Sequence, residues 1–126
     1  MYATLVDNTM KITVTSGKHE ANYALDGSQM NPLEAFYASL AACAAVFTKK
    51  ACKSLGVSPA GIEIDGKPFA GPGGPLTLSK FKTAVRFPEG FTAEQKAAIL
   101  DSIQHCAVKE IVKTGASVEF MVEEIA

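Results

Sequence analysis

The N-terminal part of the chain alternates between apolar and polar residues with a period of two. This alternation is typical of β-strands that bury one face. It predicts strands over residues 4–6, 10–15 and 19–25. Turn residues separate these strands at positions 7–8 and 16–17, so we expect an antiparallel meander.

A long helical segment follows the meander. Asn31 is suited to cap a helix that begins at Pro32, with Glu34 as its capping-box partner. Residues 32–55 contain no internal Gly or Pro, and Gly56 is suited to end the helix. Such a helix is about 36 Å long. Because its first turns carry a single charge, we expect it to be buried on most faces, in part by a second copy of the chain.

The alternating pattern returns after the helix. It predicts strands over 62–65 and 76–87, joined by a loop rich in Pro and Gly over 68–75. The same alternation predicts a last strand over 117–122. These segments add three antiparallel strands to the meander.

Two further helices are predicted ahead of the last strand. Thr92 can cap the first of them with Gln95 as capping-box partner, and the second covers 108–113 and ends at Gly115. The element order βββ-α-ββ-α-α-β indicates an α+β fold with antiparallel sheets. The chain has 126 residues and neither an internal repeat nor a linker, so we expect a single domain over 1–126.

Composition and charge exclude several classes of protein. Hydrophobic residues make up 48% of the chain and charged residues 20%, which excludes a disordered chain. The net charge of −1 offers no basic excess for phosphate contacts, so we expect no nucleic-acid partner. There is neither a signal peptide pattern nor an apolar run of about 20 residues, so we expect no membrane segment and a cytoplasmic location.

Familiar cofactor motifs are missing from the sequence. It has neither a Gly-x-Gly-x-x-Gly fingerprint nor a phosphate loop. The two histidines are His19 and His105, and no Cys-x-x-Cys occurs. A metal site from Cys43, His105 and Cys106 is conceivable, but we expect no metal and no other cofactor.

The three cysteines remain as candidates for chemistry, and their low, odd number fits a reducing compartment. Cys43 lies in the middle of the long helix. Cys52 follows nine residues later and faces the opposite side, so these two cannot serve one site. Cys106 lies between two helices, where a thiol can approach a partner from elsewhere in the fold. The alternative for each is simple packing as a small hydrophobic residue.

A thiol in the middle of a helix needs a nearby cation to lower its pKa. The candidates for Cys43 are Lys18, Lys50, Arg86 and His105. The neighbours of Cys43 on its helix face are Phe36, Ser39, Leu40 and Phe47. This lining suits an apolar substrate pocket and equally a plain hydrophobic core.

Residues 31–43, NPLEAFYASLAAC, resemble the signature of the OsmC/Ohr family of osmotically inducible and organic hydroperoxide resistance proteins. In that signature an Asn/Thr-Pro helix start leads through an Ala-rich segment to a reactive Cys. Cys106, in HCAVKE, resembles the later Cys of the family, which also lies between two helices. The resemblance covers essentially the whole chain and implies an OsmC-like intertwined homodimer with two active sites at its interface.

The resemblance also implies a thiol peroxidase that reduces organic hydroperoxides to alcohols. Cys43 corresponds to the peroxidatic cysteine, which becomes a sulfenic acid, and Cys106 to the resolving cysteine, which forms a disulfide with it. A dithiol reductant of the lipoyl type restores both thiols. The alternative is a relative without peroxidase activity, which binds a hydrophobic small molecule or responds to redox state.

Two helper residues of the family differ in this chain. The family's Arg after Gly corresponds to Lys18, which carries charge without the bidentate fork, and Arg86 is the alternative cation. The family's carboxylate corresponds to Leu33, with the acid one residue later at Glu34. One residue turns a helix by about 100°, so Glu34 points elsewhere, and capping with Asn31 is its alternative role. Lys18 and Glu34 complete the candidate catalytic set.

Overall fold

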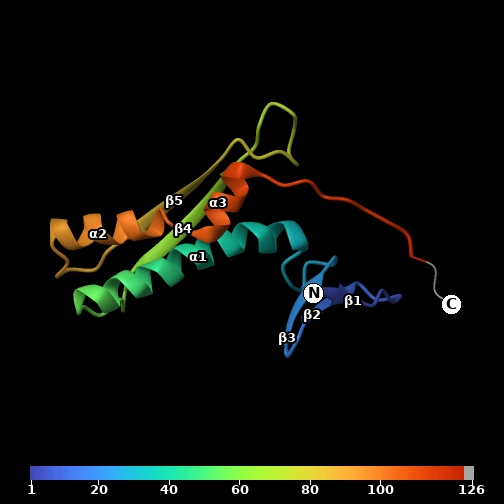
Figure 1. Cartoon of the computed structure of the whole chain (residues 1–126), viewed down its shortest axis with the longest axis horizontal. Coiled ribbons are helices and arrows are strands. Elements are labelled where there is room, and N and C mark those ends of the chain that lie inside the picture. The colour runs from blue at the N-terminus through green and yellow to red at the C-terminus, as the bar shows by residue number, and fades with distance from the viewer. Residues whose placement is uncertain (124–126) are drawn as a thin grey trace. The chain divides into compact units, whose positions relative to one another are not determined.

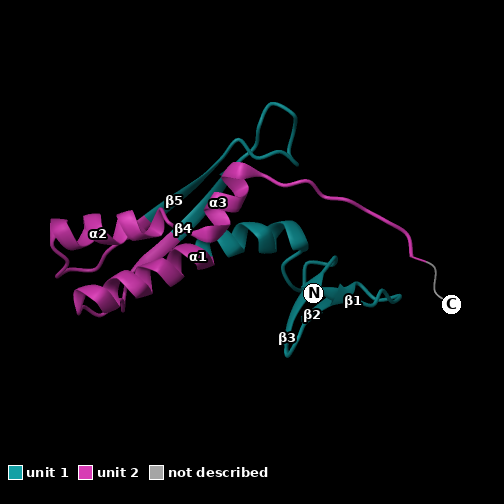
Figure 2. Cartoon of the chain, in the orientation of Figure 1, with its two compact units in different colours: residues 1–41, 65–84 teal, residues 42–64, 85–126 magenta. Residues whose placement is uncertain are grey.

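The computed structural model describes residues 1–123, which contain the eight helices and strands labelled in Figure 1. They are β1 (Ala3–Thr4), β2 (Lys11–Ser16), β3 (His19–Ala24), α1 (Pro32–Leu55), β4 (Glu63–Phe69), β5 (Lys80–Arg86), α2 (Ala93–Ile103) and α3 (Ala107–Thr114). The chain divides into two units, shown in Figure 2. The first comprises residues 1–41 and 65–84, and the second comprises 42–64 and the described residues from 85 onward.

The predicted meander is present as an antiparallel sheet in the order β1-β2-β3. Ile12 lies opposite Tyr23, and Val14 lies opposite Ala21. These four side chains are all partly buried, whereas the residues between them in β2 are exposed. The period-two pattern therefore gives the sheet one apolar face. Strand β1 covers only Ala3–Thr4, so the predicted strand over 4–6 is wrong at Leu5 and Val6, which lie outside the sheet.

Helix α1 has the bounds that the sequence predicts. The Asn31 side chain accepts a hydrogen bond from the Glu34 amide at 2.9 Å, and the Glu34 carboxylate accepts one from the Asn31 amide at 3.2 Å. Gly56 follows the helix with a φ of +70°, a conformation that glycine adopts without a steric penalty. The side chains of α1 that are buried lie four residues apart and form one stripe. They are Leu40, Ala44, Thr48 and Cys52.

Strands β4 and β5 form a two-stranded sheet. The predicted strand over 76–87 is wrong at its start, because β5 begins only at Lys80. The residues before it belong to the turn, where the Thr77 hydroxyl accepts a hydrogen bond from the Gly71 amide and donates one to the Gly74 carbonyl. These local bonds compete with strand pairing for the backbone groups.

The second unit is packed around α2 and the second half of α1. Ile99 of α2 and Cys52 of α1 are both 0% exposed, which marks the centre of its core. The predicted capping box is present at the start of α2. The Thr92 hydroxyl accepts from the Gln95 amide at 3.1 Å, and the Gln95 side chain accepts from the Thr92 amide at 2.9 Å.

Replacing Thr92 by Ala is expected to lower the free energy of unfolding by about 1 kcal/mol, because one helix-start amide loses its partner. Urea unfolding followed by circular dichroism measures the change. The matched control is Thr114→Ala at the exposed end of α3, for which we expect less than about 0.5 kcal/mol. Equal effects of the two substitutions contradict the cap assignment.

The predicted strand over 117–122 is wrong. Residues 115–123 have no regular secondary structure, and Val118, Phe120 and Val122 are exposed to 74%, 92% and 90%. A strand forms only where another strand accepts its backbone hydrogen bonds, and no strand among residues 1–123 pairs with this segment. The alternating pattern therefore indicates a preference for strand structure, but the segment forms no strand in the described chain because it has no partner strand.

Candidate functional site

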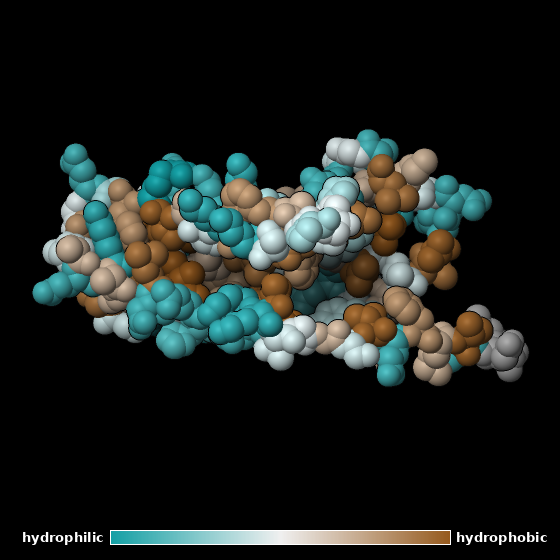
Figure 3. Space-filling model, turned by 90° about the horizontal axis from the view of Figure 1, so that it is seen from above, coloured by the Kyte–Doolittle hydropathy of each residue, from teal (hydrophilic) through white to brown (hydrophobic). Residues whose placement is uncertain are grey.

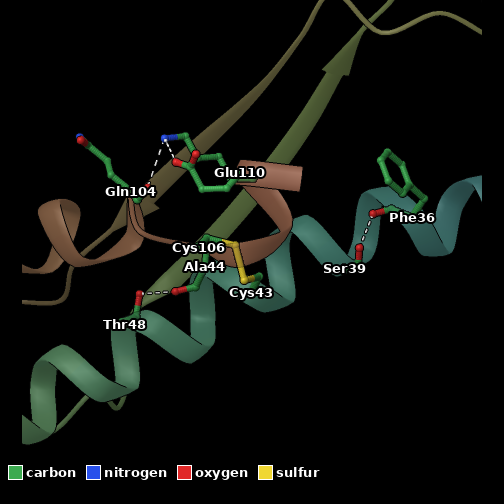
Figure 4. The surroundings of a disulfide bond; sticks show 9 residues. Phe36, Ser39, Cys43, Ala44, Thr48, Gln104, Cys106 and Glu110 are labelled. Carbon is green, nitrogen blue, oxygen red and sulfur yellow. Dashed lines mark hydrogen bonds and ion pairs between the residues drawn. A yellow bond between two sulfur atoms is a disulfide. The ribbon is translucent and has the colours of Figure 1, made fainter. Parts of the chain in front are cut away.

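A disulfide joins Cys43, in the middle of α1, to Cys106, which immediately precedes α3 (Figure 4). Their Cα atoms are 6.1 Å apart, within the usual range for disulfides, although 63 positions separate them in the sequence. Both residues belong to the second unit. The pairing implied by the family resemblance is therefore present, whereas its use in catalysis stays a prediction.

Hydrogen bonds place Cys106 next to α1. Near the end of α2, the Ser102 hydroxyl donates to the Phe47 carbonyl of α1 at 3.3 Å. The chain then turns tightly, because the amides of His105 and Cys106 donate to the carbonyls of Ser102 and Ile103, each at 3.1 Å. This turn ends α2 and brings the sulfur of Cys106 toward α1.

The two cysteines differ in exposure and in local structure. Cys106 is 3% exposed, whereas Cys43 is only partly buried. Cys106 is also the N-cap of α3, with φ −59° and ψ 127°, and its carbonyl accepts the first helical hydrogen bond from Glu110. Its side chain makes no capping hydrogen bond. The Cys106 side chain therefore does not cap the free backbone amides in the first turn of α3.

Charged groups follow Cys106 on α3. The Lys109 ammonium donates to the Gln104 carbonyl at 3.2 Å and to the Glu110 carboxylate at 3.1 Å. The hydrogen bond from Lys109, together with the charge of Lys109, lowers the pKa of Glu110. Glu110 thus stays negatively charged at neutral pH, next to the Lys109 ammonium in the first turn of the helix.

Cys52 is free, and it is fully buried. Burial raises the pKa of its thiol, so Cys52 remains protonated at neutral pH and is a poor nucleophile. The prediction that Cys52 does not share a site with Cys43 is confirmed by the disulfide, which leaves Cys52 out.

Lys18 and Glu34 lie in the first unit, whereas the disulfide lies in the second. Lys18 is exposed in the turn between β2 and β3, directly after Gly17. Glu34 caps α1 together with Asn31, so its structural role is confirmed. A catalytic role for Lys18 or Glu34 stays a prediction.

Two of the other candidate cations, Arg86 and Lys50, have partners of their own. Arg86 donates through Nε and Nη2 to the Glu63 carboxylate at 3.2 and 3.1 Å, which ties the end of β5 to the start of β4. The Lys50 ammonium lies 5.0 Å from the centre of the Phe47 ring. Among residues 1–123, no three His, Cys, Asp or Glu side chains are placed to hold a metal ion together.

An apolar pocket of about 370 Å³ lies within the first unit. It is lined by Ile12, Val14, Tyr23, Pro32, Ala35, Phe36 and Ser39. Phe36 and Ser39 are predicted from their place on the helix face of Cys43, whereas the strand residues are not. The period-two pattern of β2 was the signal for them, because it places Ile12 and Val14 on one face of the sheet.

The fold is thus an α+β fold with antiparallel sheets and a long central helix, and a cysteine pair links that helix to the start of α3. The family described as OsmC-like protein matches residues 25–121. The chain therefore belongs to the OsmC-like family. No curated protein matches it.

Three solved structures have a similar fold. An OsmC-like protein from Mycoplasma pneumoniae is 12% identical, with a TM-score of 0.72 over 90% of this chain and 86% of that one. A putative osmotic stress induced and detoxification response protein from Psychrobacter arcticus is 13% identical, with a TM-score of 0.71 over 86% and 85%. An organic hydroperoxide resistance protein OsmC from Legionella pneumophila, also described as a predicted redox protein, is 17% identical, with a TM-score of 0.55 over 90% and 89%. At these identities the likeness concerns the fold.

No helix in the described part of the chain is long and apolar enough to cross a membrane.

Proposed function

We propose that this protein is a thiol peroxidase that reduces organic hydroperoxides through Cys43 and Cys106. The disulfide between these two residues is the observation that carries the proposal. It joins the partly exposed Cys43 to Cys106, and a peroxidatic cysteine needs both access to solvent and a resolving cysteine next to it. The similarity in fold to the Legionella hydroperoxide resistance protein supports the same function.

The proposed reaction begins with the thiolate of Cys43. Its sulfur attacks the terminal peroxide oxygen, a sulfur–oxygen bond forms, the oxygen–oxygen bond breaks, and the alkoxide leaves as an alcohol after taking a proton. The thiol of Cys106 then attacks the sulfur of the Cys43 sulfenic acid, and water leaves as the disulfide forms. A dithiol of the lipoyl type supplies the two electrons that restore both thiols. We place this cycle in the cytoplasm, a compartment that keeps thiols reduced.

Lys18 and Glu34 are the helper residues in this proposal. Lys18 supplies the positive charge that favours the Cys43 thiolate, with a single ammonium in place of a guanidinium fork. Glu34 stabilises the start of α1 through its capping box with Asn31. Arg86 is the less suitable cation, because Glu63 already neutralises it.

The test starts from the fully reduced protein, which has three free thiols per chain. A small molar excess of cumene hydroperoxide is expected to remove two of them within minutes, leaving Cys52. Titration with Ellman's reagent in denaturant counts the thiols that remain, and hydrogen peroxide at the same concentration is expected to act more slowly. The proposal fails if all three thiols survive the treatment.

The homodimer is part of the proposal. Large apolar side chains are exposed on the single chain, as the brown areas of Figure 3 illustrate. They include Leu76, Phe120, Met121 and Val122, exposed to between 79% and 92%. Phe36 and Val46 of α1 are also exposed, to 42% and 48%. A second copy of the chain is the partner that removes this surface from water, and it places two active sites in one particle.

Light scattering after gel filtration tests the dimer. We expect a particle of about twice 13.3 kDa across micromolar concentrations. A mass of 13.3 kDa at the highest concentration contradicts the homodimer and leaves the peroxidase test unaffected.

The apolar pocket of the first unit favours a second candidate function, the binding of a hydrophobic small molecule. A fluorescent apolar probe such as anilinonaphthalene sulfonate distinguishes the two candidates. Saturable probe binding by a protein whose thiols resist cumene hydroperoxide supports the binding function. Rapid loss of two thiols supports the peroxidase.

A further inference from the structure

The disulfide presents its two sulfur atoms unequally to an incoming reagent. Cys106 is 3% exposed and is the last residue of the turn between α2 and α3, whereas Cys43 is partly exposed on α1. Exchange requires an attacking thiolate to approach one sulfur in line with the bond that breaks. Access therefore favours attack at Sγ of Cys43.

The local structure favours the same direction. When the disulfide opens, one sulfur leaves as a thiolate, and the thiolate with the lower pKa leaves faster. Cys106 is the N-cap of the eight-residue helix α3, where the first-turn amides and the positive end of the helix dipole stabilise an anion. Cys43 lies in the interior of α1, so its own helix offers no free N-terminal amides to its thiolate. Lys109 adds a positive charge to the first turn of α3, which Glu110 partly offsets.

We infer that the reductant attacks Cys43 and that Cys106 is the leaving group. This inference rests on the proposed function, because it concerns the step that regenerates the thiols. The first thiolate of the dithiol forms a bond to Sγ of Cys43 while the bond between Cys43 and Cys106 breaks, and Cys106 departs as a thiolate. The second thiol of the reductant, as its thiolate, then attacks the reductant's own sulfur in the mixed disulfide. This yields a cyclic disulfide and the Cys43 thiolate. The two electrons pass to the protein through Cys43 alone.

The experiment traps the mixed disulfide with 2-mercaptoethanol, a monothiol that cannot complete the second step. Purified protein is oxidised with diamide, mixed briefly with the monothiol, acidified, and alkylated with N-ethylmaleimide. Trypsin separates the two positions, because Cys43 falls in the peptide 19–49 and Cys106 in the peptide 97–109. Mass spectrometry then reports which peptide carries the monothiol and which carries the maleimide. The variant Cys52→Ala is treated in parallel to exclude exchange with the third thiol.

We expect the monothiol on Cys43 and the maleimide on Cys106, in about tenfold excess over the reverse pattern. A predominance of the monothiol on Cys106, equal labelling of both peptides, or the absence of any adduct overturns the inference. So does a protein that diamide leaves with both thiols free. The trapping begins from the oxidised protein and uses no peroxide, so it is independent of the cumene hydroperoxide test. A protein that fails that test and still directs the monothiol to Cys43 refutes the peroxidase and keeps the order of exchange.

Discussion

Replacing Cys43 by Ser is expected to reduce the consumption of cumene hydroperoxide by at least about a thousandfold. The serine hydroxyl is not ionised at neutral pH and cannot form the sulfenic acid through which the proposed reaction passes. The remaining thiols cannot substitute, because Cys106 and Cys52 are buried at 3% and 0% exposure. Peroxide consumption with dihydrolipoamide as reductant measures the effect.

Cys106→Ser is the matched variant for the same reaction. It keeps the nucleophile of Cys43, so the first turnover is expected to proceed and to consume one thiol per chain rather than two. The sulfenic acid then persists, and dimedone is expected to label Cys43. Normal turnover by Cys43→Ser, or a Cys106→Ser variant that loses no thiol, contradicts the assignment of the two roles.

Reduction of the disulfide is expected to lower the free energy of unfolding by about 4 kcal/mol. The bond closes a loop over 63 positions, and a loop of this size restricts the unfolded chain by about that amount. For a chain of 126 residues, this corresponds to a fall in Tm of about 15 °C. Thermal unfolding of the diamide-oxidised and phosphine-reduced proteins, followed by circular dichroism at one protein concentration, measures the difference.

Two variants separate this effect from general damage to the core. Cys43→Ser cannot form the disulfide, so its Tm is expected to be the same under oxidising and reducing conditions. Cys52→Ala keeps the disulfide and is expected to keep the full difference, even where the loss of a buried side chain lowers both values. If the Tm of Cys43→Ser differs between oxidising and reducing conditions, the stabilisation of the parent protein does not come from the disulfide.

The elements that the sequence predicts well depend on short-range interactions. The cap of α1 needs only Asn31 and Glu34, and the cap of α2 needs only Thr92 and Gln95, each pair three residues apart. Gly56 ends α1 through its own backbone preference. Such interactions are complete within one helical turn, so the residue types and their spacing are enough to predict them.

The segment 117–122, predicted as a strand, depends instead on long-range interactions. Its alternating residues are suited to a strand, but a strand also needs the edge of a neighbouring strand, from any part of the chain or from another copy of it. In the described chain no such edge pairs with it, and its apolar side chains remain exposed. Strand β5 begins four residues later than predicted for a related reason. The Thr77 hydroxyl forms hydrogen bonds with the Gly71 amide and the Gly74 carbonyl, so this segment belongs to the turn.

By itself the sequence determined the bounds of α1, the caps of α1 and α2, and the opposite orientations of Cys43 and Cys52 on one helix. From the residues alone, Cys43 remained either a reactive thiol or a core residue, and only a resemblance paired it with Cys106. The tertiary structure decided that pairing, because the tight turn after α2 brings together two residues that are 63 positions apart. It also decided which sulfur is buried. Both properties depend on how α2 and α3 pack against α1, and contacts between distant segments leave no periodic trace in a single sequence.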